Sequence, residues 1–476
     1  MRSALWARAT FVVLAITGIA AYGADFRAGA GKSEIQTSPD MWPLEGYTSM
    51  HDQASVRVLI LDDGKSRFAI GCIETPSAGD AVIGVAKAAL TKAAGVPAEN
   101  AIIFTTHSTS APHISIGNVG EGPQGGRNAR PGGPAGAGGP GGPGGPGGQN
   151  RAGAAAYATA YTAAVETAVQ QAAGSMQPAK VGFGVGASNI GVNRDVPTPR
   201  GWAQGSNSAG FTDRSLPVIR IEGADAKPIA VVMNVSVRPV VMDASKDGKD
   251  GNKALSADLS GAASRYVEQW YGGSTVAIFL MGAAVDQAPV LMSSRSVLNR
   301  DGTMSDRDLG AAGFTVLDLL GERLGSDAIK ASESIKATAQ PTIEVVRKTI
   351  KVPSQGRVAT NTGPNSGPVQ SYAYPEKGTD VDLPLVVMRI GDIAIPGIQP
   401  ELASAVGAQI KAQSPYPNTM VVTMADGNAK YMVDAQSFDR FTAEARGSQF
   451  ARGAAESVAT ELVNVMKQMK QSSGDK

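Results

Sequence analysis

The chain has 476 residues, of which 42% are hydrophobic, and its formal net charge is +1. This length allows one large domain or two to three smaller ones, and the hydrophobic content is sufficient for a large buried core. A near-zero net charge argues against a nucleic-acid-binding surface, because such surfaces carry a clustered basic excess.

The N-terminus has the pattern of a secretory signal peptide. Arg2 and Arg8 flank the start of an apolar run at residues 9–21, which small residues follow. The run is too short to span a bilayer, so residues 1–24 are predicted to be a signal peptide, with an uncleaved anchor as the alternative. No later stretch is long and apolar enough for an integral membrane span. The mature chain is therefore predicted to be exported, either periplasmic or secreted.

Apolar periodicity predicts strands and helices that alternate along the mature chain. The predicted strands are residues 56–61, 68–73, 101–104, 181–185, 218–221, 229–237, 276–280, 383–390, 393–397 and 420–424. The predicted helices are residues 80–94, 154–174, 259–270, 314–324, 402–412 and 451–469. Turn signals at residues 62–64 and 391–392 predict two hairpins. This alternation predicts an α/β fold, with a mixed β-sheet core and flanking helices in a single large domain.

Two further features constrain the chain. Residues 118–153 are of low complexity, and Pro-Gly-Gly recurs from 131 to 148. Such a segment lacks the apolar side chains that offset ordering entropy, so it is predicted to be a disordered insertion, either a flexible cover or a tolerated surface expansion.

Cys72 is the single cysteine and lies in an apolar run, which predicts a buried hydrophobe and no intramolecular disulfide.

Short motifs follow one another along the mature chain. They are residues 30–35, 43–47, 51–52, 106–112, 193–194, 235–239, 256–261, 279–289, 400–401 and 428–431. Each motif alone is weak. Their shared order, however, resembles the N-terminal catalytic domain of the neutral/alkaline non-lysosomal ceramidases over residues 25–476. The chain ends before the immunoglobulin-like C-terminal domain of those enzymes would begin.

The resemblance implies a zinc hydrolase for N-acyl amide bonds. That family holds zinc with two histidines, a glutamate and a tyrosine, and three of these positions match His107, Glu401 and Tyr431. The second histidine falls on Arg238, which offers no lone pair and whose charge opposes a nearby Zn²⁺. Zinc is therefore implied as the cofactor by the resemblance but opposed by Arg238. One alternative is that Arg238 pairs with Glu401 and fills the metal position.

Other residues could rebuild a metal site in place of the lost histidine. His113 lies in the same loop as His107, and His51 is the third histidine of the chain. Asp258 and Asp286 could supply oxygen ligands, which suit Ca²⁺ or Mg²⁺ better than Zn²⁺.

Three residues are candidates for catalysis by resemblance. Arg194 matches an active-site arginine of the family, and Asp286 falls in a Gly-Asp-x-Ser/Asn-Pro-like element in which Ala288 replaces the polar residue. Thr109 stands at the second signature histidine, but a hydroxyl does not titrate near neutrality. The alternatives are structural: Asp258 and Asp286 as helix caps or turn residues, His107 as a hydrogen-bonded remnant, and Tyr431 as a core residue.

Two hypotheses of different classes follow. The first is a divergent exported hydrolase of a ceramide-like amide or an ester. The second is a non-catalytic binding protein that retains the pocket for a lipid, a glycan or an anionic ligand. A weaker third hypothesis is an interaction through the Gly/Pro-rich arm. No nucleic-acid partner is expected, and the oligomeric state is left open.

Overall fold

The computed structural model describes residues 26–117, 150–243, 252–301, 303–338, 341–356 and 367–472. The predicted signal peptide lies outside these residues, and so does the predicted insertion up to residue 149. Helix α2 (Arg151–Gly174) begins within the range assigned to the insertion, because the Asn150 side chain accepts a hydrogen bond from Gly153 N and caps the helix. The helix therefore starts earlier than the predicted residue 154.

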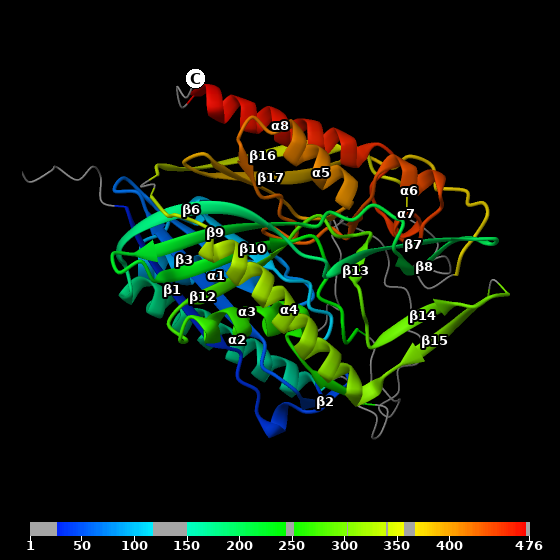
Figure 1. The fold of residues 1–476 in the computed structure, drawn as a ribbon, viewed down its shortest axis with the longest axis horizontal. Helices are drawn as coiled ribbons and strands as arrows, with labels where there is room; N and C mark the ends of the chain where they lie inside the picture. The colour runs from blue at the N-terminus through cyan, green and yellow to red at the C-terminus, as the bar shows by residue number, and fades with distance from the viewer. Residues whose placement is uncertain are drawn as a thin grey trace, which may run out of the picture.

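A mixed sheet of eight strands forms the centre of the fold (Figure 1). The strand order is β12-β10-β9-β6-β1-β3-β4-β5. Their bounds are Arg27–Glu34 (β1), Ser55–Asp62 (β3), Arg67–Ile73 (β4), Ala101–Thr105 (β5), Gln177–Ala187 (β6), Ser215–Gly223 (β9), Pro228–Val235 (β10) and Val276–Met281 (β12). The β4–β5 and β10–β12 pairs are parallel, and the other neighbours are antiparallel.

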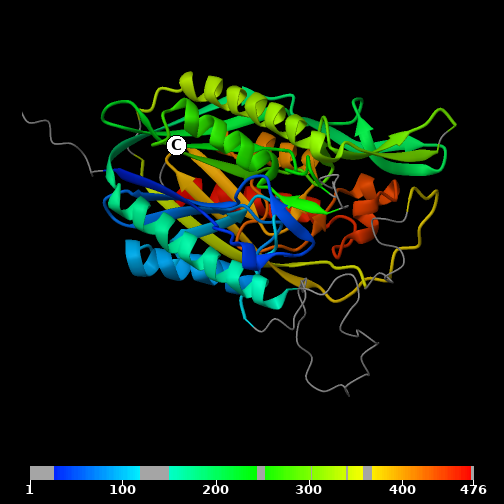
Figure 2. The same cartoon turned by 90° about the horizontal axis from the view of Figure 1, so that it is seen from below.

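Helices cover one face of this sheet. They are α1 (Asp80–Ala94), α2, α3 (Asp258–Trp270) and α4 (Gly313–Glu333), and they pack on alternate side chains of the strands. Figure 2, seen from below, shows them as two pairs, α1 with α2 and α3 with α4. The predicted mixed sheet with flanking helices is confirmed.

A second sheet covers the opposite face through a shared hydrophobic core. It contains β16 (Ile343–Val352), β17 (Val381–Ile390), β18 (Ile393–Ile398) and β20 (Asn418–Thr419). Helices α5 (Ser404–Gln413) and α8 (Ala454–Ser472) pack on its far side, so the fold has four layers (Figure 1). The sequence predicted strands of both sheets but not their stacking.

Short elements complete the fold. They are β2 (Tyr47–Met50), β7 (Gly191–Thr198), β8 (Gly201–Asn207), β11 (Lys253–Leu255), β13 (Gln287–Pro289), β14 (Ser294–Leu298), β15 (Met304–Asp308), β19 (Glu401–Leu402), β21 (Tyr431–Met432), α6 (Ala435–Asp439) and α7 (Ala443–Gly447). Of these, β7, β8 and β13 form a small sheet, and β19 pairs with β21. These elements carry most of the candidate site.

The two predicted hairpins are present as β3–β4 and β17–β18. The predicted strand at 420–424 is wrong. Its backbone N–H groups donate to two different strands, from Val422 N to Pro396 O in β18 and from Thr423 N to Met281 O at the end of β12. Met424 also has a φ of 57°, which is not the backbone conformation of a strand. The segment bridges two sheets and makes only isolated bridges with its neighbours.

Cys72 is buried, as predicted for a small hydrophobic side chain. It is 3% exposed, and its Sγ lies 3.2 Å from Phe279 O, to which it donates a hydrogen bond. Burial raises the pKa of the Cys72 thiol to about 12, so the reactive thiolate is not formed near neutrality.

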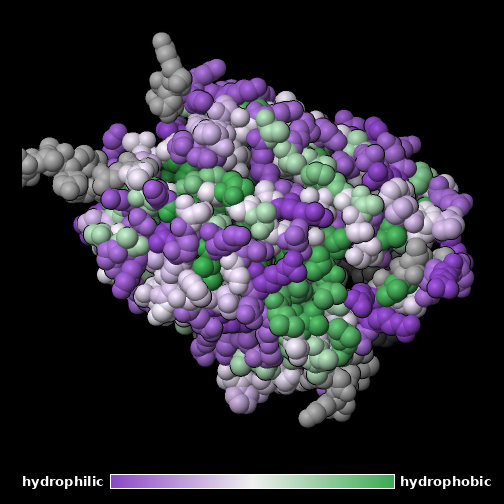
Figure 3. All heavy atoms as spheres, in the orientation of Figure 1, coloured by the Kyte–Doolittle hydropathy of each residue, from purple (hydrophilic) through white to green (hydrophobic). Residues whose placement is uncertain are grey.

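The surface carries several exposed apolar side chains. They include Leu291 after β13, and Leu309 and Leu319 at α4. Figure 3 shows hydrophobic atoms gathered on the face that α4 and β13 share. Within the described ranges, no helix is both long and apolar enough to cross a membrane.

Close approach of α2 to β1 leads to a first prediction. A Cβ at Gly31 would lie 2.2 Å from Ala168 O and 2.7 Å from Ala172 N, both backbone atoms of α2. Because backbone cannot move aside locally, we expect Gly31→Ala to destabilise the fold by about 1–3 kcal/mol, measured by chemical denaturation. Gly84→Ala is the control, because its Cβ meets nothing within 4 Å on an exposed turn of α1, and it should stabilise slightly. Equal stability of both variants would contradict the prediction.

Candidate functional site

Residues far apart in the sequence meet beside the ends of three strands. His107 lies in the loop after β5, Arg238 follows β10, and Glu401 begins β19 shortly after β18. Glu401 and Tyr431 are direct partners in the parallel β19–β21 pair. The four positions that the sequence resemblance assigned to a zinc site are therefore brought together.

The Arg238 guanidinium occupies the middle of this group. Its Nε lies 2.9 Å from Glu401 Oε2, and its Nη2 lies 2.9 Å from His107 Nε2. The Nε–Oε2 contact is an ion pair and not an aligned hydrogen bond. Arg238 Cζ also lies 5.6 Å from the centre of the Tyr431 ring. The alternative in which Arg238 pairs with Glu401 describes the arrangement found.

Burial makes this contact energetically important. Arg238 is 7% exposed and Glu401 is 2% exposed. Burial alone would lower the pKa of Arg238, but the nearby Glu401 and Tyr431 raise it overall, so the guanidinium stays charged. A buried cation and a buried carboxylate thus compensate each other.

Hydrogen bonds define the state of His107. Its Nδ1 lies 2.9 Å from Pro76 O, which can only accept, so we assign the ring proton to Nδ1. Its Nε2 then accepts from Arg238, which can only donate. Burial lowers the pKa of His107, with Glu401 opposing and Arg238 adding to the decrease. The imidazole is therefore neutral, and its lone pair is already used.

The side chains present do not fit a zinc ion. The His107 nitrogen that would coordinate a metal accepts from Arg238 instead, and Glu401 is paired with the same guanidinium. Across the described ranges, no group of three or more His, Cys, Asp or Glu side chains is arranged to hold a metal. The other histidines do not rebuild the site, since His113 bonds to Glu45 and His51 stacks on Phe314.

Arg194 is connected to the group around Arg238 by Glu444, a residue that the sequence did not indicate. Its Nε is 3.4 Å from Glu444 Oε1, and Glu444 is 2% exposed on α7. Glu444 also contributes to the raised pKa of Arg238. Gln204 on β8 donates to Glu444 Oε1 at 2.8 Å. Glu444 belongs to no motif, so no sequence signal could have located it.

Asp286 has the contacts of a structural residue. Its carboxylate accepts four hydrogen bonds, from Ser404 N, Ser404 Oγ, Gln287 Nε2 and Asn193 Nδ2. The bond from Ser404 N holds the first turn of α5, as the structural alternative for Asp286 anticipated. A catalytic role for Asp286 remains a prediction.

Thr109 and Asp258 contact residues outside the group around Arg238. Thr109 O accepts from Tyr47 OH at 2.9 Å, while its buried Oγ1 has no hydrogen-bond partner among the described residues. Asp258 accepts from three backbone N–H groups, those of Val241, Met242 and Leu259, and from Ser110 Oγ, so it joins the segment after β10 to the start of α3. The role assigned to Thr109 also remains a prediction.

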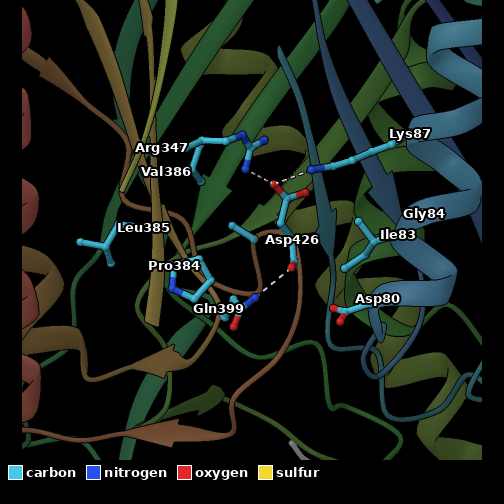
Figure 4. Close-up of a pocket in the computed structure, with 11 residues that line it drawn as sticks. Asp80, Ile83, Gly84, Lys87, Arg347, Pro384, Leu385, Val386, Gln399 and Asp426 are labelled. Carbon is cyan, nitrogen blue, oxygen red and sulfur yellow. Dashed lines mark hydrogen bonds and ion pairs between the residues drawn. The ribbon is translucent and has the colours of Figure 1, made fainter. Parts of the chain in front are cut away.

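A separate pocket of about 270 Å³ lies between α1 and β17 (Figure 4). Lys87 and Arg347 both form ion pairs with Asp426 Oδ2, at 3.0 Å and 2.6 Å. Gln399 donates to the Asp426 carbonyl. None of the residues that line this pocket belongs to the group around Arg238. The two cations of the pocket, Lys87 and Arg347, share the Asp426 carboxylate.

Solved structures with a similar architecture include two ceramidase structures. The crystal structure of the neutral ceramidase from Pseudomonas aeruginosa matches with a TM-score of 0.64 and 14% identity, over 94% of this chain and 75% of that chain. A ceramidase complexed with C2 matches with a TM-score of 0.63 and 14% identity, over 94% of this chain and 76% of that chain. No family model and no curated protein matches the sequence. The chain therefore has a neutral ceramidase-like fold, as the motif order implied.

Proposed function

We propose that this chain is an exported binding protein that uses a ceramidase-like fold without zinc-dependent hydrolysis. The observation that carries the proposal is the position of Arg238 between His107 Nε2 and Glu401 Oε2. A hydrolytic zinc site needs protein ligands and one open position for water. Here a protonated side chain takes the place of the ion and uses the ligand atoms.

The chemistry of the neighbouring residues agrees with this proposal. Thr109 cannot exchange a proton near neutrality where the ceramidases have a histidine. Tyr431 faces the Arg238 guanidinium, at 5.6 Å from its ring centre. The group therefore lacks both free ligand atoms for a metal and the second histidine that the resemblance would require.

A lipid-like ligand fits the charges better than an anion does. The charge of Arg238 is compensated by Glu401, and that of Arg194 by Glu444. An anion would have to compete with these internal carboxylates. Exposed apolar side chains near α4 and β13 are typical of a surface that meets apolar partners.

A divergent hydrolase for an amide or ester is the second candidate. It is favoured by the neutral His107 and by Arg194, which lies at the edge of the same group. Under this alternative, hydrolysis would depend on Arg194 and would persist in the presence of a chelator.

The proposal is tested by metal content in an Arg238→His variant. We expect the wild-type mature protein to bind no stoichiometric zinc, because Arg238 occupies the ligand atoms. The variant should bind zinc stoichiometrically, since it restores a second imidazole beside His107, Glu401 and Tyr431. Elemental analysis of both proteins after zinc loading and dialysis gives the measurement.

An Arg452→His variant is the matched control, because this arginine is exposed and pairs with Asp439 at the surface. It should bind no more zinc than the wild type. Stoichiometric zinc in the wild-type protein would overturn the proposal and favour the hydrolase.

A further inference from the structure

A bulge in β7 directs two charged residues toward Glu444. The β7–β8 register shifts between Asn193 and Asp195, and beyond the shift Asp195 is the partner of Gln204. Cross-strand partners place their side chains on the same face of the sheet, and a bulge re-aims side chains beside it. Because Gln204 donates to Glu444 and Arg194 lies 3.4 Å from it, Asp195 lies on the same side as this carboxylate.

The charges around Asp195 do not balance. The charged groups with the largest influence on it are Glu444 on α7, Asp286 before β13, Arg194 on β7, and Arg440 at the end of α6. Arg440 is held in place over the Trp202 ring, at 4.2 Å from its centre. Asp195, Glu444 and Asp286 together with two guanidinium groups leave one negative charge in excess. In a buried environment such an excess favours binding of a proton.

Hydrogen bonds indicate which carboxyl group holds that proton. Burial raises the pKa of Asp286, and the four hydrogen bonds that its carboxylate accepts oppose this increase without cancelling it. Glu444 accepts a hydrogen bond from Gln204 and pairs with Arg194. The Asp195 carboxyl oxygens accept no hydrogen bond from the residues that the structure describes, although Asp195 is 6% exposed. The charges of Arg194 and Arg440 favour an ionised Asp195, but no hydrogen bond from the described residues adds to them.

We propose that Asp195 and Glu444 form a carboxylic acid–carboxylate pair that holds one proton at neutral pH. This pair gives the site a titrating group in a position that no motif of the sequence marks. While Asp195 is protonated, Glu444 is the carboxylate that pairs with Arg194. Loss of the proton adds a second negative charge beside the guanidinium, so the pair controls how strongly Arg194 is held.

The direction of the pKa shift agrees with this geometry. Burial raises the pKa of Asp195 well above its ordinary value, and Glu444 and Asp286 raise it further, while Arg194 and Arg440 oppose. The proton site goes beyond the proposed function, since it is observable in the absence of any ligand.

Infrared spectroscopy of the mature protein tests the pair, because a protonated carboxyl group absorbs apart from a carboxylate. We expect the wild type at neutral pH to show a carboxylic acid band that Asp195→Asn removes. Glu444→Gln should remove the same band, because it abolishes the repulsion that keeps the proton on Asp195. Asp213→Asn is the control and should leave the band unchanged. Lys411 pairs with Asp213, and the pKa of Asp213 is lowered, so this residue is a carboxylate at neutral pH. An unchanged band in Asp195→Asn would overturn the proposal.

The pH dependence of unfolding supplies a second measurement. An aspartate has a pKa of about 3.9 in an unfolded chain, and the folded value of Asp195 is higher. Folding is therefore favoured by this residue at low pH and loses that advantage as the pH rises toward the folded pKa. Relative to Asp195→Asn, the unfolding constant of the wild type should rise by up to about tenfold per pH unit above pH ~4. A ratio that does not change with pH would overturn the proposal.

Discussion

Replacement of Arg238 by methionine is expected to destabilise the protein by about 3–5 kcal/mol. The substitution removes the cation that lies 2.9 Å from Glu401 Oε2 and 2.9 Å from His107 Nε2. Glu401 is 2% exposed, so it would remain buried with no compensating charge. Urea denaturation of the wild type and the variant, at the same pH and salt, gives the difference directly.

Two further variants separate the ion pair from simple loss of packing. Glu401→Gln in the wild-type background should also be costly, because it leaves Arg238 buried without its carboxylate. The double variant Arg238→Met/Glu401→Gln should recover part of the loss, since neither charge is then left alone. The exposed control Arg452→Met should show no measurable change. A single Arg238→Met variant as stable as the wild type would show that the guanidinium has no structural role.

An effect of similar size, about 3–5 kcal/mol, is expected for Arg57→Met in the centre of the large sheet. Arg57 Nη1 lies 2.6 Å from Glu74 Oε1, and Arg57 Nε lies 3.0 Å from Glu268 Oε1. All three side chains are 3% exposed or less. Burial would lower the pKa of Arg57, but Glu268 and Glu74 raise it overall, so the guanidinium stays charged between two buried carboxylates.

The pH dependence of Arg57→Met follows from Glu74. Burial already raises the pKa of Glu74 in the wild type, and Arg57 opposes this increase. Without Arg57 the pKa rises further, and an acid with a raised folded pKa loses its contribution to stability as the pH increases. The destabilisation should therefore be smaller near pH 4 than at pH 7.

Lys32→Met is the graded control for this network. Lys32 contacts Glu268 Oε2 at 2.7 Å, but its side chain is 37% exposed, so solvent screens the pair. We expect a loss well below that of Arg57→Met. Equal losses in thermal or urea denaturation would contradict the distinction between the buried and the half-exposed cation.

Local sequence patterns predicted the regular parts of the fold well. The predicted helix at 80–94 coincides with α1, and the turn signals at 62–64 and 391–392 join antiparallel strands. β1 was missed because its glycines have low strand propensity. They are placed there because α2 passes so close to β1 that Gly29 and Gly31 have no room for a side chain. That reason involves a helix far along the chain.

The candidate site was likewise predicted only in part from the sequence. The chemistry of Arg238 indicated a pair with Glu401, because a guanidinium in a carboxylate-containing metal position has one natural partner. Glu444 and Asp195 were not indicated. Glu444 lies 250 residues from Arg194 in the sequence, and the two side chains meet because the fold places β7 beside α7.

By itself the sequence determined the α/β class, the order of most strands and helices, the burial of Cys72 and the presence of an arginine at position 238, where the resemblance implies a histidine. These properties depend on local periodicity, turn residues and the chemistry of single side chains. Only the tertiary structure decided the stacking of the two sheets, the bridging course of residues 420–424 and the neighbours of Asp195. Those properties depend on long-range packing and on the charges that it brings together in a buried space, which no local pattern records.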